Sequence, residues 1–304
     1  MQKMIPFRIL PVVILTMMIP VFACENTYEQ ELSKWRADRE RSLRSENGWL
    51  SLVGRYPLKE GVNSIGSGND NDVIFPDSLE GVGPERLGEI VVDSERKTVT
   101  LKLTDGVAMN RAGQSFSGET KLSTAVDKRD WVSLGRMSMH IIERGGRYFL
   151  RLADNASPLR LNFPGCKWYP PDETFAVQAK FVRYPETKML SIVNIIDEVS
   201  EQPCPGYAEF RLGGEVVRLD AIQEGDGLFF IFRDATAGDT TYRAARFLDV
   251  EKTPEPNATF LLDFNKAYNP PCAFSQCTTC PLPPKRNVLK LRIEAGEMHQ
   301  EKPN

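Results

Sequence analysis

The chain has 304 residues, 41% of them apolar, and its 38 basic and 41 acidic residues give a formal net charge of −3. This near balance excludes the strongly basic surface that is typical of nucleic-acid-binding proteins. With only two histidines, His140 and His299, the chain also has little capacity for zinc binding or histidine-based acid–base catalysis.

The N-terminus has the pattern of an export signal. Two basic residues, Lys3 and Arg8, precede an uncharged apolar run, residues 9–22, which is shorter than the about 20 residues that a membrane-spanning helix needs. The run ends in Val21-Phe22-Ala23-Cys24, which resembles a bacterial lipoprotein box. We expect residues 1–23 to be a cleaved signal and Cys24 to carry palmitate, which would anchor the protein to a cell-envelope membrane on the periplasmic side. Ordinary signal cleavage without lipidation is the alternative.

Residues 24–46 are predicted to form a tether followed by one amphipathic helix. The segment from residue 26 is highly charged and lacks Gly and Pro, while Tyr28, Leu32 and Trp35 recur at helical spacing on one face. This apolar stripe indicates a helix that packs on the rest of the domain. Asn47-Gly48 provides the stop signal.

After Trp49 the pattern changes to short apolar or alternating runs that are separated by turn residues. Gly145-Gly146 and Gly213-Gly214 each join two such runs, which is typical of tight β-hairpins. Strands at this spacing, with no alternation of strand and helix, indicate antiparallel sandwiches or barrels. Late in the chain, Leu289–Ala295 is predicted to be the last strand.

A proline-rich break, Pro164–Pro171, divides the predicted strands into two groups of similar size. We therefore predict a mainly β protein with two antiparallel β-sandwich or barrel-like units, at residues 47–163 and 164–297, and a tail at 298–304. Trp168 and Tyr169 make the break too apolar for a free linker, so the units are expected to pack closely.

Long motifs, including "FRDATAGDTTYRAARFL" and "DFNKAYNPPCAFSQCTTCPLPPKRNVLKLRIEAGE", resemble the domain-of-unknown-function family 1684. The resemblance extends from about residue 32 to about residue 297. It implies no catalytic residues. A second, shorter resemblance lies in "EGVNSIGSGNDNDVIFPD", within residues 60–77, which is similar to the start of a forkhead-associated domain, a phosphothreonine-binding β-sandwich. Ser67 stands where that family has its phosphate-binding arginine, so the resemblance implies the fold and not phosphopeptide binding.

Three cysteines lie close together in the C-x4-C-x2-C pattern of Cys272, Cys277 and Cys280. An exported protein favours disulfides over thiol-bound metals, and the prolines that flank these cysteines, with no glycine in the loop, leave few free amides for an iron–sulfur cluster. We predict a disulfide between Cys272 and Cys280, with Cys277 as the competing partner, and no metal or cofactor. The pairing of the remaining cysteines, Cys166 and Cys204, stays open.

A disulfide would make residues 263–284 a rigid loop, and rigid loops on β-scaffolds often contact ligands. The candidate ligand-binding side chains are polar and lie in this loop or in the turn after residue 233: Asn265, Tyr268, Asn269, Thr236 and Tyr242. The alternative is that such polar groups bond the backbone of irregular turns.

Asp234, Asp263 and Arg246 are the candidate catalytic residues. In a shared pocket the two carboxylates would act as an acid–base pair and the arginine would bind an anionic substrate. Ordinary ion pairing is the structural alternative. Two functions follow from these motifs: an anchored protein that binds a small molecule or an envelope partner through residues 263–284, or a carboxylate-dependent hydrolase built from residues 234–246 and 263–297.

Overall fold

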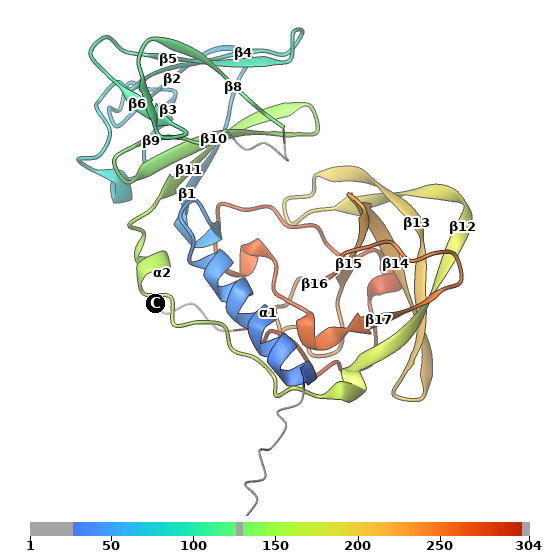
Figure 1. The fold of residues 1–304 in the computed structure, drawn as a ribbon. Helices are drawn as coiled ribbons and strands as arrows, with labels where there is room; N and C mark the ends of the chain where they lie inside the picture. The colour runs from blue at the N-terminus through green and yellow to red at the C-terminus, as the bar shows by residue number, and fades with distance from the viewer. Residues whose placement is uncertain (1–26, 126–129, 300–304) are drawn as a thin grey trace, which may run out of the picture.

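The computed structural model describes residues 27–125 and 130–299, and the lipidation prediction for Cys24 falls outside them. The fold is mainly β, with three sheets and one long N-terminal helix (Figure 1). The predicted fold class is therefore confirmed. No helix in the described part of the chain is long and apolar enough to cross a membrane.

Two sheets pack face to face in the first half of the chain. One has the strand order β1 (Leu52–Pro57), β11 (Arg147–Asp154), β10 (Met137–Arg144), β9 (Val132–Leu134), β6 (Met109–Arg111) and β7 (Gln114–Phe116). The other has the order β3 (Val73–Ile74), β2 (Gly61–Gly66), β4 (Gly88–Asp93), β5 (Thr98–Leu103) and β8 (Glu119–Leu122). Strands β2 and β3 pair in parallel, whereas the other strand pairs described in these two sheets are antiparallel.

Alternation of side chains produces this sandwich. In β4 every second residue is buried, as expected for a strand with one face toward a core. Ile90 and Leu101 from one sheet and Met139 and Leu150 from the other are completely buried in the shared core. The β10–β11 hairpin turns at Gly145 and Gly146, whose φ angles of 56° and 75° favour glycine. This turn carries the hairpin tip toward the second unit.

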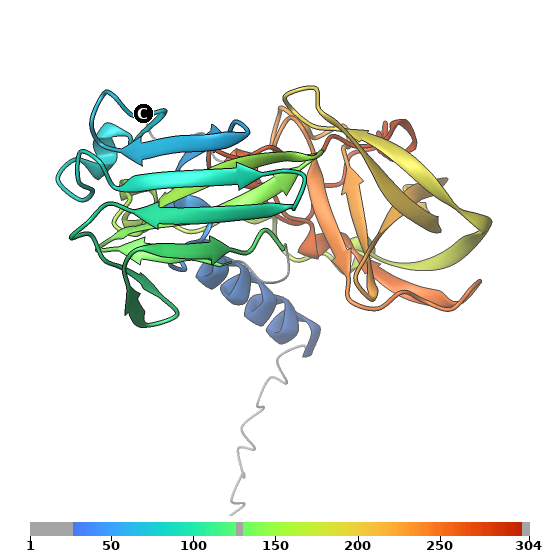
Figure 2. The ribbon, with the colours of Figure 1, turned by 90° about the horizontal axis from the view of Figure 1, so that it is seen from above.

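The third sheet curls into a half-barrel (Figure 2). Its order is β16 (Arg246–Val250), β15 (Gly227–Phe232), β14 (Glu215–Glu224), β13 (Val199–Leu212), β12 (Ala176–Val193) and β17 (Thr259–Asp263). Phenylalanines 181, 210, 230, 232 and 264 fill its interior. A smaller apolar cluster at one end of the half-barrel includes Ile192, Ile222 and Ile231 together with Cys272 and Cys280.

Helix α1 (Thr27–Leu43) lies beside the half-barrel and the segments that cover it (Figure 1). The predicted apolar stripe faces the protein, since Leu32 is buried and the Trp35 ring contacts the rings of Trp168 and Tyr268 at 5.7 and 6.4 Å. Arg39 continues this face, with its guanidinium 4.6 Å from the Tyr268 ring centre. The only other α-helix among the described residues is the single turn α2 (Pro158–Leu161).

The prediction of a last strand at Leu289–Ala295 is wrong. This segment crosses the half-barrel as irregular chain, bonded to it at separate points such as Leu289 N to Arg233 O at 2.7 Å. A regular ladder cannot form because the Ile293 N–H donates to the Asp234 carboxylate, at 2.7 Å, instead of to a strand carbonyl. Its apolar side chains still reach the core, where Ile293 and Ala295 are completely buried.

Candidate ligand-binding cavity between the two units

Asp234 and Arg246 form a buried ion pair. Arg246 Nη2 lies 2.9 Å from Asp234 Oδ1, and each side chain is only 1% exposed. The guanidinium also donates to the carbonyls of Ile293 and Ala295. Burial lowers the pKa of Arg246, and the neighbouring Asp234 carboxylate opposes this shift. The pair therefore fixes the C-terminal segment on the half-barrel.

Thr236 belongs to the same buried network. Its hydroxyl donates to Asp234 Oδ2 at 2.8 Å and shares a hydrogen bond with Thr241, and the residue is 0% exposed. Tyr242 is half-buried, with its ring centre 5.3 Å from that of His299. The turn that was predicted to contact a ligand thus bonds mainly to itself.

Asp263 lies at the end of β17, under the start of α1. Its carboxylate accepts hydrogen bonds from the Tyr28 hydroxyl and from the backbone N–H and side-chain amide of Asn265, each at 3.0 Å. Burial, and then the Asp263 charge, raises the pKa of Tyr28. No hydrogen bond or ion pair among the described residues joins Asp263 to Asp234 or Arg246. The three candidate catalytic groups are thus not brought into one bonded cluster.

Asn269 is part of a second buried cluster. Its side-chain amide donates to Glu297 Oε1 at 3.0 Å, and its backbone carbonyl accepts from Arg39 at 2.9 Å. Burial raises the pKa of Glu297, whereas the positive charge of Arg39 counteracts this effect. Tyr268 donates to Asp249 at 2.8 Å. The polar residues of the loop therefore attach it to α1 on one side and to the C-terminal segment on the other.

The loop contains the predicted disulfide between Cys272 and Cys280, whose Cα atoms are 6.1 Å apart. Cys166, Cys204 and Cys277 are free thiols. Within residues 27–125 and 130–299, no three His, Cys, Asp or Glu side chains are grouped in a way that could hold a metal ion. After Cys280 the chain runs beside the end of β12, where the Leu282 N–H donates to the Val193 carbonyl at 2.7 Å.

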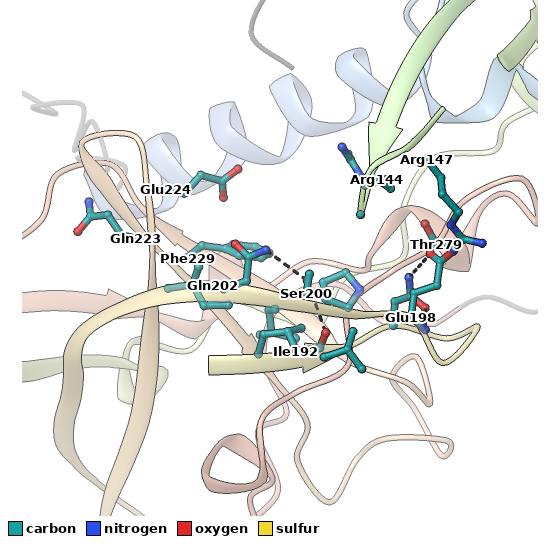
Figure 3. A pocket seen from close by; sticks show the side chains of 16 residues that line it. Arg144, Arg147, Ile192, Glu198, Ser200, Gln202, Gln223, Glu224, Phe229 and Thr279 are labelled. Carbon is teal, nitrogen blue, oxygen red and sulfur yellow. Dashed lines mark hydrogen bonds and ion pairs between the residues drawn. The ribbon is translucent and has the colours of Figure 1, made fainter. Parts of the chain in front are cut away.

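A cavity of about 600 Å³ lies where the β10–β11 hairpin meets the half-barrel (Figure 3). Its volume is within the range of roughly 300–1,000 Å³ that is typical of small-molecule sites. The apolar residues that line it are Ile192, Val199, Ile222, Phe229, Ile231 and Pro281. The polar residues are Arg144, Arg147, Asn194, Glu198, Ser200, Gln202, Gln223, Glu224 and Thr279. None of the candidate site residues predicted from the sequence is among them.

The two units meet at this cavity through an ion pair between Arg147 of β11 and Glu198, which precedes β13. Glu198 is also held by Asn194, whose amide donates to it at 2.9 Å. Figure 3 shows the arginines, Glu198 and Thr279 at one end of the cavity and Glu224 with Gln223 at the other. Ser200 and Gln202 lie between them. The cavity therefore has opposite charges at its two ends.

The cavity exists because the half-barrel sheet divides at this point. Strand β14 pairs with β13 from Gly206–Ala221 to Leu212–Glu215, and beyond Ala221 it pairs with β15 instead. The start of β13, residues 199–205, keeps only β12 as a neighbour among the described strands. Two prolines, Pro203 and Pro205, lie in this stretch. Proline in a strand is typical of an edge, so these residues were the sequence signal for the opening.

Comparison with known proteins places the second unit in a family. Residues 161–298 match the family described as "Protein of unknown function (DUF1684)". The match is shorter than the predicted resemblance, because residues 32–160 lie outside it. No curated protein matches the chain.

Two solved structures are similar to parts of the chain. An uncharacterized protein from gene locus rrnAC0354 of Haloarcula marismortui is 30% identical, with 46% of this chain and 78% of that chain covered, at a TM-score of 0.40. The FhaA FHA domain, solved in complex with the intracellular domain of Rv3910, is a distant match at 19% identity, with 32% of this chain and 96% of that chain covered, at a TM-score of 0.21. Over residues 161–298, the chain belongs to the DUF1684 family.

Proposed function

We propose that the protein binds a small amphipathic molecule in the cavity between its two units. The observation that carries this proposal is the combination of an apolar floor with charged groups at both ends. Ile222 and Ile231 are 5% and 1% exposed and form part of that floor, while Arg144 and Glu224 lie at opposite ends. Apolar contact surface together with placed polar groups that fix the orientation of a ligand is typical of ligand pockets.

The disulfide-closed loop contributes to this cavity through the residues around Cys280, where the loop ends, and not through its buried polar residues. Thr279 and Pro281 line the cavity on either side of Cys280, so the disulfide positions this wall. We therefore keep the proposal that residues 263–284 contact a ligand, but through Thr279 and Pro281 and not through Asn265, Tyr268 and Asn269. The hydrolase alternative has weaker support, because Asp234 and Arg246 bond to each other with about 1% of each side chain exposed.

The dye anilinonaphthalene sulfonate, which combines an apolar aromatic body with one anionic group, tests the proposal. We expect its fluorescence to rise when it binds the purified chain. Ser200→Trp, which fills the cavity, should abolish the increase. Ser115→Trp is the matched control, because Ser115 is an exposed residue of β7 in the first unit. Equal fluorescence in all three proteins would contradict binding at this cavity.

We also propose that the protein is exported and held at a cell-envelope membrane by a lipid on Cys24. The support is the sequence Val21-Phe22-Ala23-Cys24 after an apolar run. Cys24→Ser should release the protein from the membrane fraction and abolish incorporation of labelled palmitate. If the wild-type protein takes up no palmitate, or if the variant stays with the membranes, lipid anchoring at this residue is wrong.

A further inference from the structure

We infer that the ligand is a short peptide with free termini, which adds as an antiparallel strand to the open edge of β13 inside the cavity. This inference rests on the proposed function, and it specifies the chemical class of the ligand and its orientation. Three observations carry it: the direction of the unpaired backbone groups of β13, the separation of charge along the cavity and the apolar floor between the charges.

The first observation concerns the backbone of β13. The Asn194 N–H donates to the Glu198 carbonyl at 2.9 Å, so this pair is hydrogen-bonded across the β12–β13 hairpin. Hydrogen-bonded and non-hydrogen-bonded pairs alternate along an antiparallel ladder, and the register of β12 and β13 is continuous from Val193–Val199 to Lys188–Cys204. From Ser200 to Cys204, even-numbered residues of β13 therefore direct their N–H and C=O groups toward β12, and odd-numbered residues of this stretch direct theirs away.

The odd-numbered residues face the side that β14 leaves. No described strand pairs with β13 there over residues 199–205. Pro203 and Pro205 have no N–H to offer, which agrees with this assignment. Val199 and Glu201 each present both a donor and an acceptor to the gap. Exposed sheet edges of this kind bind extended peptides by adding a strand.

The second observation is that the charges lie at opposite ends of this edge. Arg144 and Arg147, the latter paired with Glu198, are at the end where β13 begins, and Glu224 is at the other (Figure 3). A peptide that runs antiparallel to β13 brings its C-terminal carboxylate to the arginines and its amino group to Glu224. Glu224 also lies near Asp249, whose negative charge would further favour an ammonium group. A tripeptide spans about 10 Å when extended.

The third observation is the floor of the cavity between the charges. Phe229 lines it together with the buried Ile222 and Ile231. In an extended peptide alternate side chains point to the same side, so one apolar side chain of a tripeptide can contact these residues. Main-chain bonds to β13 would supply affinity, and the floor would select an apolar central residue.

The test uses the tripeptide Ala-Leu-Ala with both termini free, in competition with anilinonaphthalene sulfonate on the purified chain. We expect the peptide to displace the dye. Amidation of its C-terminus should weaken binding about tenfold, because a hydrogen-bonded charge pair is lost. Methylation of the leucine nitrogen should have an effect of similar size, because it removes a main-chain donor and obstructs the approach to β13.

A matched pair of variants examines the open edge itself. Glu201→Pro removes an N–H that faces away from β12 and extends the existing pattern of Pro203 and Pro205. We expect it to bind the dye normally and the peptide about tenfold more weakly. Glu201→Ala removes the same side chain but keeps the N–H, so it should bind the peptide like the wild type.

The outcomes distinguish the two proposals. If the dye binds in the cavity and no peptide displaces it, the peptide inference is overturned while the proposed function stands. If the dye does not bind, both are overturned. Equal affinity for the methylated and unmethylated peptides would overturn strand addition, and this comparison decides the matter even if Glu201→Pro does not fold.

Discussion

Two polar regions of the molecule differ in how far their charged side chains are buried. Asp234 and Arg246 bond to each other, Glu297 accepts a hydrogen bond from Asn269, and all three charged side chains are at most 4% exposed. In the cavity between the units, Arg144 and Glu224 remain exposed at opposite ends of an apolar floor. A dense polar motif in a sequence can thus serve to fix irregular chain, while a candidate site depends on where two strands separate.

Removal of one partner of the buried ion pair should have the largest effect on stability. Arg246→Leu leaves the Asp234 carboxylate uncompensated in a buried position, so we expect the free energy of unfolding to fall by about 3–5 kcal/mol. Urea denaturation measures this change. Arg218→Ala, at the exposed ion pair with Glu209, is the control and should have little effect. A loss below about 1 kcal/mol for Arg246→Leu would contradict the proposed structural role.

The disulfide connects the two regions, because it closes the loop whose exit lines the cavity. Replacing Cys272 and Cys280 together by Ala should lower the free energy of unfolding by about 2–3 kcal/mol, from the closure of a loop of this length. Dye affinity should also decline, because Thr279 and Pro281 are less firmly positioned. Cys277→Ala is the control and should change neither property. Unaltered melting of the double variant would show that the disulfide is dispensable.

The buried cluster of Asn269 and Glu297 should also make the free energy of unfolding depend on pH. Burial raises the pKa of Glu297 in the folded protein above its value in the unfolded chain. The folded state then binds more protons, so this group makes stability fall as pH rises from about 4.3 through the raised folded pKa. Glu297→Gln should remove this part of the slope. Parallel slopes of unfolding free energy against pH in the two proteins would disprove the assignment.

The smallest expected effect concerns the free thiols. Burial raises the pKa of Cys204 to about 11, and its side chain is fully buried. Cys277 is partly exposed. Iodoacetamide at mildly alkaline pH should therefore modify Cys277 first and Cys204 only after unfolding, as peptide mapping by mass spectrometry can measure. Rapid modification of Cys204 in the folded protein would show that this part of the half-barrel opens.

Local patterns predicted much of the fold. The helix face of Tyr28, Leu32 and Trp35, the glycine hairpins and the alternating strands all depend on neighbouring residues, and sequence shows these directly. The Leu289–Ala295 segment has strand-like residues, yet its bonding is decided by distant groups such as Asp234. Propensity alone cannot show that a side-chain carboxylate takes the place of a neighbouring strand.

The candidate cavity was harder to predict, because it too depends on residues that are far apart in the chain. Asp234, Asp263 and Asn269 stand out in the sequence as a polar cluster, but their burial depends on α1 and the C-terminal segment, which are far away in the chain. The cavity forms where β14 leaves β13 to pair with β15, which is a property of three strands together. Only Pro203 and Pro205 mark the opening locally.

Amide hydrogen exchange, measured by NMR with and without saturating Ala-Leu-Ala, tests the central claim most directly. Without peptide, the Glu201 N–H faces the gap left by β14 and should exchange quickly, whereas the Gln202 N–H bonds to β12 and should be protected. We predict that the peptide slows exchange at Glu201 and leaves Gln202 unchanged. Unchanged exchange at Glu201 under saturating peptide, or new protection confined to other parts of the chain, would contradict a ligand site at the open edge of β13.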